Sequence, residues 1–182
     1  RTCQPKNCHR RHWICSDPAY TIFIPKETTT VTTTFADYAA SAEARNDIAQ
    51  AILGHTFALC QALEQNFVKE SIRRQQFFLV SAENKEYHEQ KIADLQHNIG
   101  TYQFTVDTGR KYHKVMMTTD GGNRSVHAFV NKTTGEVYKP ASIKAPAKGV
   151  RFNMLIIKER EFMLENADWA GGYLYRNAGY TG

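Results

Sequence analysis

The chain has 182 residues, a formal net charge of +5 and 42% hydrophobic residues. That apolar content is enough to bury the core of one domain and excludes a wholly disordered chain. Its longest apolar runs, at 77–80 and 154–157, are far shorter than the roughly 20 residues that cross a bilayer. We therefore expect no membrane partner.

The positive charge lies mainly in the C-terminal half. Residues 31–99 hold six Lys/Arg and nine Asp/Glu, or −3, whereas residues 100–160 hold eleven and four, or +7. A basic region beside an acidic one indicates where any contact with nucleic acid would be made.

Cysteine and histidine are crowded into the opening residues. The set is Cys3, Cys8, His9, His12 and Cys15. These side chains are the types that bind zinc, but their spacing matches no usual zinc framework. Three interpretations of residues 1–30 stay open: untranslated upstream sequence, a disordered tail, or a metal-binding knuckle. The first is favoured, with translation starting at Val31, because a purine-rich codon pair can encode Lys26-Glu27 and GTG can encode the valine.

Residues 31–99 are predicted to be helical. Thr34 and Ser41 precede strong helix formers, so their hydroxyls can cap a helix that begins near residue 35. Apolar residues then recur at helical spacing and predict one buried face. They are Ile48, Ile52, Leu59, Leu63 and Phe67. Ser81 can begin a second helix that Gly100 ends, so a helical hairpin or a dimerising helix pair fits the pattern.

From residue 101 the pattern alternates between apolar and polar residues, which indicates strands. The predicted strands are 102–106, 110–117, 125–130 and 136–139. The turns between them are short, so we expect four antiparallel strands in meander order. Gly135, in the last turn, is expected to take a positive φ. Strict alternation places Tyr112 and Lys114 on one face, and also places His127 and Phe129 together.

A loop and a helix are predicted to close the chain. Pro140 ends the last strand, and the loop 141–149 should be extended and either ordered or semi-ordered. Asn153 can cap a helix near 154–167. The side chains expected to face the sheet are Ile156, Ile157, Phe162, Met163 and Ala167. The predicted fold is α+β, with a helical region at 31–99 and a basic antiparallel sheet plus covering helix at 100–182.

The run VHAFVNKTTGEVYKPASIKAPAKGVR and the closing DWAGGYLY resemble small proteins encoded by tailed bacteriophages. The similarity covers about residues 100–176. It implies a phage gene whose product is found in the host cytoplasm during infection, or in the virion. It implies no activity.

The basic module suggests contact with single-stranded nucleic acid, because cations can neutralise phosphates while aromatic rings stack on bases. The candidate cations are Arg110, Lys111, Lys114, Arg124, Lys139, Lys144, Lys148 and Arg151, and the candidate rings are Tyr112, Phe129 and Tyr138. Lys144 and Lys148 are the strongest candidates, since a proline-braced loop displays them. The alternative is that the rings pack the sheet and the lysines keep its edges unpaired.

Signals for catalysis are weak. There is no P-loop, nucleophile elbow or paired-carboxylate pattern. His113 and His127 lie on adjacent predicted strands, where Asp107 or Asp120 could join them in a metal or acid-base site, but strand histidines are more often satisfied polar residues. We therefore expect a non-enzymatic protein without a cofactor or catalytic residues.

A third class is a virion component or a protein that binds a host factor. An acidic helical region beside a basic sheet suits contact between subunits, including pairing of identical copies through unlike charges.

Overall fold

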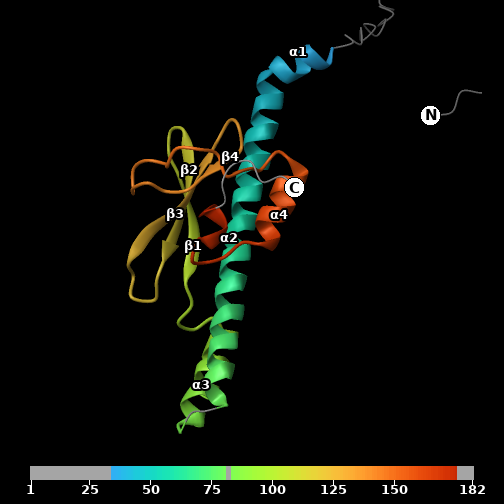
Figure 1. The fold of residues 1–182 in the computed structure, drawn as a ribbon. Coiled ribbons are helices and arrows are strands. Elements are labelled where there is room, and N and C mark those ends of the chain that lie inside the picture. The colour runs from blue at the N-terminus through green and yellow to red at the C-terminus, as the bar shows by residue number, and fades with distance from the viewer. Residues whose placement is uncertain (1–33, 81–82, 176–182) are drawn as a thin grey trace, which may run out of the picture. The chain divides into compact units, whose positions relative to one another are not determined.

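The computed structural model describes residues 34–80 and 83–175 (Figure 1). The interpretations of residues 1–30, the start at Val31 and the cap at Ser81 lie outside the described residues. Among the described helices, none combines the length and the apolar character needed to cross a membrane.

The fold is α+β, as predicted, and the sheet is an antiparallel meander in the order β1-β2-β3-β4-β5. The strands are β1 (Gln103–Thr108), β2 (Tyr112–Thr118), β3 (Arg124–Asn131), β4 (Glu136–Tyr138) and β5 (Phe152–Asn153). The first four match the predicted strands. The fifth is a two-residue strand that pairs with β4 and extends the predicted sheet by one member.

The N-terminal region is helical, as expected. It contains α1 (Phe35–Ala40), α2 (Ala42–Leu79) and α3 (Lys85–Gln96). Both predicted caps are confirmed, because Thr34 accepts the N–H of Asp37 and Ser41 accepts that of Ala44. The helices α2 and α3 pack against each other as a helical hairpin. In Figure 1 the end of the hairpin at which α2 leads into α3, which we call its closed end, extends beyond the sheet.

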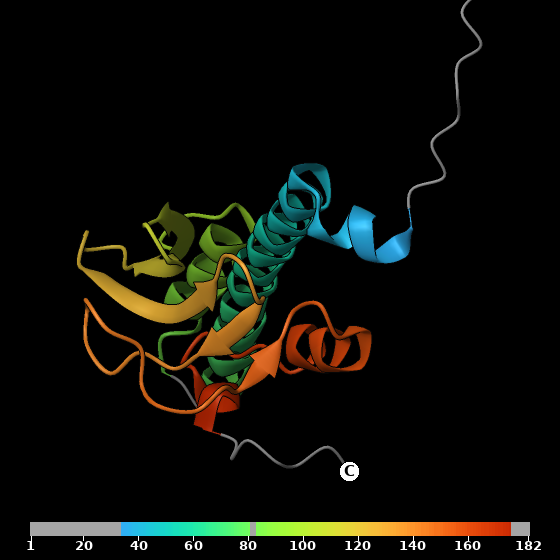
Figure 2. The same ribbon diagram turned by 90° about the horizontal axis from the view of Figure 1, so that it is seen from above.

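The core lies between α2, α4 (Ile157–Glu165) and one face of the sheet, which we call the inner face. Figure 2 shows both helices on this side of the strands. The predicted stripe of α2 supplies four buried side chains: Ile52, Leu59, Leu63 and Phe67. The first three share one buried cluster with sheet residues such as Val115, Val130 and Phe152, and Phe67 stacks on Tyr102. Ile48 is an exception and remains 38% exposed.

The start of the closing helix was placed too early. The side chain of Asn153 accepts the N–H of Leu155 in a turn, and α4 begins only at Ile157. Ile156 and Ile157 are consequently 47% and 61% exposed rather than buried against the sheet. The predicted burial of the later residues is confirmed, because Phe162, Met163 and Ala167 belong to the core or pack against it.

A β-bulge overturns the prediction that His127 and Phe129 lie on the same face of the sheet. The register between β2 and β3 shifts between Val115 and Met116, which leaves His127 as the extra residue. Its ring lies against Phe104 on the inner face, at 5.3 Å between centroids. Phe129 instead lies on the opposite side, beside Lys114 and Tyr138. Alternation failed here because an extra residue resets which face each side chain occupies.

Candidate functional site

The candidate site is the sheet face that points away from α2, which we call the outer face. It carries Thr105, Asp107, Tyr112, Lys114, Met116, Phe129 and Tyr138. The pairing register brings them together, since Lys114 lies opposite both Asp107 and Phe129, and Phe129 lies opposite Tyr138. The predicted grouping of Tyr112 with Lys114 is confirmed.

Three aromatic side chains form a cluster on the outer face. The ring of Tyr112 lies edge-on to Phe129 at 5.8 Å and to Tyr138 at 6.0 Å. Tyr112 and Tyr138 are half-buried, whereas Phe129 is 0% exposed. The proposal of Phe129 as a base-stacking residue is therefore wrong for this conformation, because a fully buried ring offers no face to a ligand. Phe129 instead packs edge-on against Tyr112 and lies opposite Tyr138 in the sheet.

Lysines lie over aromatic rings around this cluster. The Nζ atom of Lys111 is 5.2 Å from the centre of Tyr112, and that of Lys114 is 5.8 Å from the centre of Phe129. Lys139 approaches the ring of Tyr175 to 3.5 Å. These distances fall within the roughly 6 Å range of cation–π attraction. Within the described residues, none of these three ammonium groups forms an ion pair with a carboxylate.

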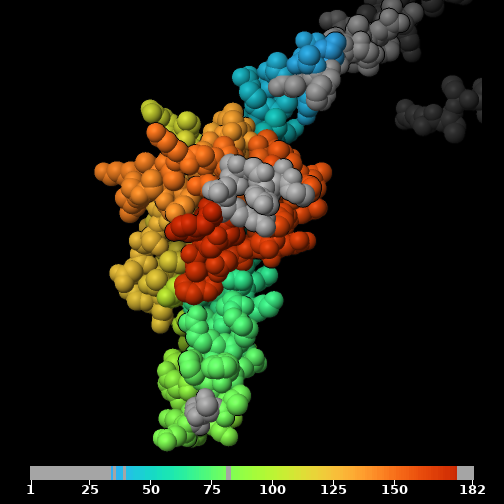
Figure 3. Space-filling model, in the orientation of Figure 1, coloured from blue at the N-terminus to red at the C-terminus, as the bar shows by residue number. Residues whose placement is uncertain are grey.

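The loop between β4 and β5 is ordered, as predicted, and displays Lys144 and Lys148. Both lysines are exposed. Pro140 and Pro146 form an isolated bridge, and the N–H of Ala147 donates to the carbonyl of Lys139 at 2.8 Å. The space-filling view shows this loop, in orange, as a projecting part of the surface (Figure 3).

A contact ties this loop to the outer face. The Nζ of Lys114 donates to the carbonyl oxygen of Ile143 at 3.1 Å. Because Lys144 follows that carbonyl directly, the loop lysine is held near the strand lysine. The contact therefore fixes the backbone beside Lys144 against the side chain of Lys114.

The three predicted arginines are placed differently from the lysines. Arg124 pairs with Asp107 at 3.2 Å, and both side chains are about half exposed, at 52% and 53%. Arg110 is exposed in the turn between β1 and β2. Arg151 is half-buried, with its Nε atom enclosed. The ion pair reduces what Arg124 can offer to a phosphate, and burial does the same for Arg151.

Glu136 is an acidic group beside the aromatic cluster. Its Oε2 atom accepts the hydroxyls of Thr134 at 2.7 Å and Tyr138 at 2.8 Å. These hydrogen bonds lower the pKa of Glu136, and the bond from Thr134 has the larger effect. Burial and the bond to Glu136 raise the pKa of Tyr138 to about 12, so the tyrosine stays neutral near physiological pH.

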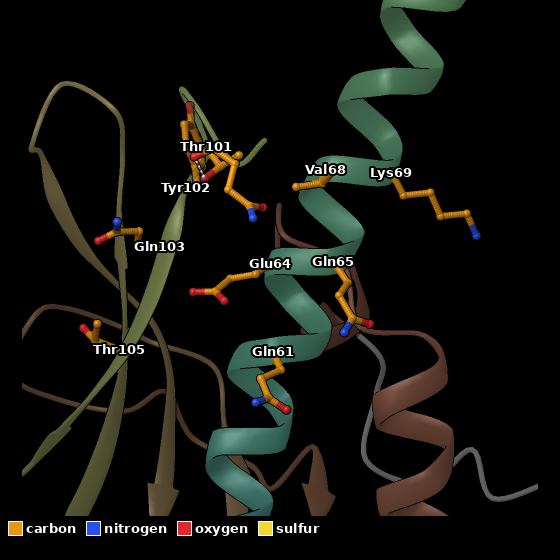
Figure 4. A pocket seen from close by; sticks show the side chains of 10 residues that line it. Gln61, Glu64, Gln65, Val68, Lys69, Thr101, Tyr102, Gln103 and Thr105 are labelled. Atoms are coloured by element: carbon orange, nitrogen blue, oxygen red, sulfur yellow. Dashed lines mark hydrogen bonds between the residues drawn. The ribbon is translucent and has the colours of Figure 1, made fainter. Parts of the chain in front are cut away.

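A groove of about 770 Å³ runs between α2 and β1 (Figure 4). Its walls are mostly carboxamide and hydroxyl side chains. They are Gln61, Glu64, Gln65, Val68, Lys69, Asn98, Thr101, Tyr102, Gln103 and Thr105. Figure 4 shows Glu64 pointing from α2 toward β1. The Oε1 atom of this residue accepts the backbone N–H of Phe104 at 2.8 Å.

The histidines considered for catalysis are separate and buried. His113 shares a hydrogen bond with Thr108 at 2.9 Å, and His127 shares one with Tyr173 at 3.1 Å. Burial lowers the pKa of both, to about 4 for His127. Within residues 34–80 and 83–175, no three His, Cys, Asp or Glu side chains gather as a metal site.

Sequence reasoning missed two parts of the site. Tyr175 is not among the predicted aromatic residues, yet it is 68% exposed and lies under the ammonium group of Lys139. The groove was missed because its walls come from positions 61–69 and 98–105, which only the tertiary fold brings together. The only local sign of the groove in the sequence is that Gln61 and Gln65, four residues apart, share one helical face.

Comparison with known proteins supplies a family but no activity. No curated protein and no solved structure matches the chain significantly. A family model matches residues 35–176, which include α1 to α4 and the whole sheet. The chain belongs to the DUF7717 family, a family of unknown function.

Proposed function

We propose that this chain is a non-enzymatic accessory protein that contacts single-stranded nucleic acid through the outer face and the β4–β5 loop. Under this proposal lysines neutralise phosphates while Tyr112 and Tyr138 meet bases. A tailed bacteriophage is the proposed source, on the resemblance of residues 100–176.

The observation that supports this proposal best is the placement of lysines beside partly exposed tyrosines. Lys111 and Lys139 lie 5.2 and 3.5 Å from the ring centres of Tyr112 and Tyr175. Single-strand binding sites combine cations with aromatic platforms in this way. A sheet packed only for stability has no need of cations on its rings, although cation–π pairs also occur as structural contacts.

Lys144 and Lys148 supply the second support. They are exposed on a loop that backbone hydrogen bonds hold in place. A fixed loop loses little conformational freedom when it binds, so the two charges can contribute to affinity at low entropic cost.

Binding of a mixed-sequence single-stranded oligonucleotide, followed by fluorescence anisotropy over a salt titration, tests the proposal. We expect affinity that falls steeply with salt, with a slope of about −0.7 per neutralised phosphate. The double variant Lys144→Ala/Lys148→Ala should therefore flatten the slope by about 1.4.

Lys85→Ala/Lys91→Ala is the matched control. It removes the same charge from two exposed lysines of α3, outside the outer face. It should leave the slope nearly unchanged. Equal effects of the two double variants, or no binding by wild type at low salt, would contradict the proposal.

A second candidate function is protein interaction through the closed end of the α2–α3 hairpin. Phe77, Val80 and Tyr87 are 73%, 86% and 53% exposed there. Large apolar side chains that cluster on a surface often mark a contact with another protein.

If the chain is a virion component, its peptides should be found in purified virions. If it pairs with itself, light scattering should show concentration-dependent association that Phe77→Ser/Val80→Ser abolishes.

A further inference from the structure

The groove between α2 and β1 opens beside the outer face. Thr105 lines the groove and lies opposite Met116 of β2, while the neighbouring outer-face pair is Asp107 with Lys114. Adjacent strands are about 4.8 Å apart. A nucleic-acid strand with a phosphate at Lys114 therefore passes close to the groove.

The groove suits a base better than a phosphate. Its only charged members are Glu64 and Lys69, whose charges offset each other, and the remainder are neutral. Among the residues that the structure describes, the side chains of Gln61, Gln65 and Gln103 have no hydrogen-bond partner. Carboxamides carry a donor and an acceptor side by side, which is the pattern that the edges of bases present.

Tyr102 gives the groove a rigid aromatic member. Its ring stacks on Phe67, with centroids 4.2 Å apart and planes 16° apart, and lies edge-on to Trp169 at 5.5 Å. These contacts fix the ring before any ligand arrives. A pre-positioned ring is the kind of platform on which bases stack.

Glu64 contributes a hydrogen-bond acceptor to the groove. Its Oε1 atom accepts the N–H of Phe104, and its other oxygen makes no hydrogen bond or ion pair with a described residue. A carboxylate oxygen only accepts hydrogen bonds. It attracts the exocyclic amino group of adenine or cytosine and repels the keto oxygen that thymine presents.

We infer that this groove holds a base with an exocyclic amino group, such as adenine or cytosine, of a bound single strand, with Glu64 accepting a hydrogen bond from that amino group. The inference rests on the proposed function, because phosphate contacts on the outer face bring the strand to the groove. The lysines then provide affinity without sequence preference, and the groove provides the preference.

The test compares oligo(dA), oligo(dC) and oligo(dT) of equal length with the full chain at one low salt concentration. Wild type should bind oligo(dA) and oligo(dC) roughly tenfold more tightly than oligo(dT). Glu64→Gln keeps an acceptor for Phe104 N–H and replaces the other oxygen with an N–H₂ donor. This variant should lose the preference or turn it toward oligo(dT).

Glu70→Gln is the matched control, because it makes the same change on α2 at a residue that pairs with Arg73 and does not line the groove. It should keep the wild-type preference. Equal, salt-dependent binding of all three oligonucleotides would leave the proposed function standing and overturn the base groove. The same shift in both glutamine variants would also overturn it. No binding of any oligonucleotide at low salt would overturn the proposed function and the groove together.

Discussion

Glu64 closes the free edge of the sheet at Phe104, where its carboxylate accepts the backbone N–H at 2.8 Å. This N–H belongs to the first strand in the sheet order and points away from β2. At the opposite edge, Glu159 of α4 accepts the N–H of Asn153 in β5 at 2.6 Å. A glutamate from a helix therefore occupies one backbone donor at each edge. Such covering hinders unwanted pairing with strands of other chains.

The variant Glu64→Ala should lower the free energy of unfolding by about 1 to 3 kcal/mol, since the edge N–H loses a charge-assisted hydrogen bond. It should also raise self-association, because the edge donor becomes available. Urea denaturation and light scattering measure the two effects. Glu64→Gln, which keeps an acceptor, should stay close to wild type in both. An alanine variant as stable and as monodisperse as wild type would show that the bond contributes nothing.

Gly135 lies in the turn between β3 and β4 with φ at +71°, as its position in the sequence predicted. A Cβ atom there would come within 3.0 Å of Leu155 Cγ and 3.1 Å of Asn153 Oδ1. Gly122 has a similar φ of +76° but no heavy atom within 4 Å of that position. A comparison of alanine substitutions at the two glycines therefore distinguishes the cost of backbone strain from the cost of steric contact.

We expect Gly122→Ala to cost about 1 to 2 kcal/mol from the positive φ alone. Gly135→Ala should cost more, because the same strain is joined by a close contact that the side chains of Asn153 and Leu155 must move to relieve. Chemical denaturation of the two variants gives the comparison. Equal losses would mean that the neighbouring side chains yield freely.

The parts of the fold that local chemistry determines could be predicted from the sequence. Thr34 and Ser41 cap helices through their own side chains, and Gly135 supplies the positive φ that one turn requires. The bulge at His127 could not be predicted, because it depends on how β2 pairs with β3. The two residues of β5 are too few to show alternation.

The same division applies to the candidate site. The exposure of Lys144 and Lys148 followed from a proline-braced loop, and the structure agrees. Alternation placed Tyr112 on the same face as Lys114 but could not reveal that Phe129 is 0% exposed, since burial depends on the segments packed above and around it. The groove required Glu64 and Thr105 to meet from separate elements.

Phe129 and Tyr112 should therefore respond differently to truncation. Phe129→Ala leaves a cavity in a fully buried position and should cost about 3 to 5 kcal/mol of stability. Tyr112→Ala removes a half-buried ring and should mainly weaken binding of single-stranded nucleic acid, by about 1 to 3 kcal/mol. Thermal denaturation and anisotropy distinguish the effects. Phe129→Leu, which retains most of the volume, should keep both fold and binding; a binding loss without a stability loss at this position would argue for direct contact.

His127 is a buried titratable group whose protonation opposes folding. It is 8% exposed, lies beside Phe104 and Tyr173, and has its pKa lowered by burial to about 4, with Asp168 partly offsetting the shift. In the unfolded chain a histidine titrates near 6.5. Between these two values the unfolded state binds the proton and the folded state does not.

Stability should consequently fall as the pH is lowered from about 6.5 to about 4, by on the order of 3 kcal/mol for this residue. Above the unfolded pKa both states are neutral, so the contribution is fully present there. His127→Gln can still bond to Tyr173 but does not titrate, and urea denaturation at several pH values should show a shallower decline for it. The lowered pKa values of His55 and His113 give a decline of the same sign in both proteins. Parallel curves for the variant and wild type would place the acid sensitivity in those other residues.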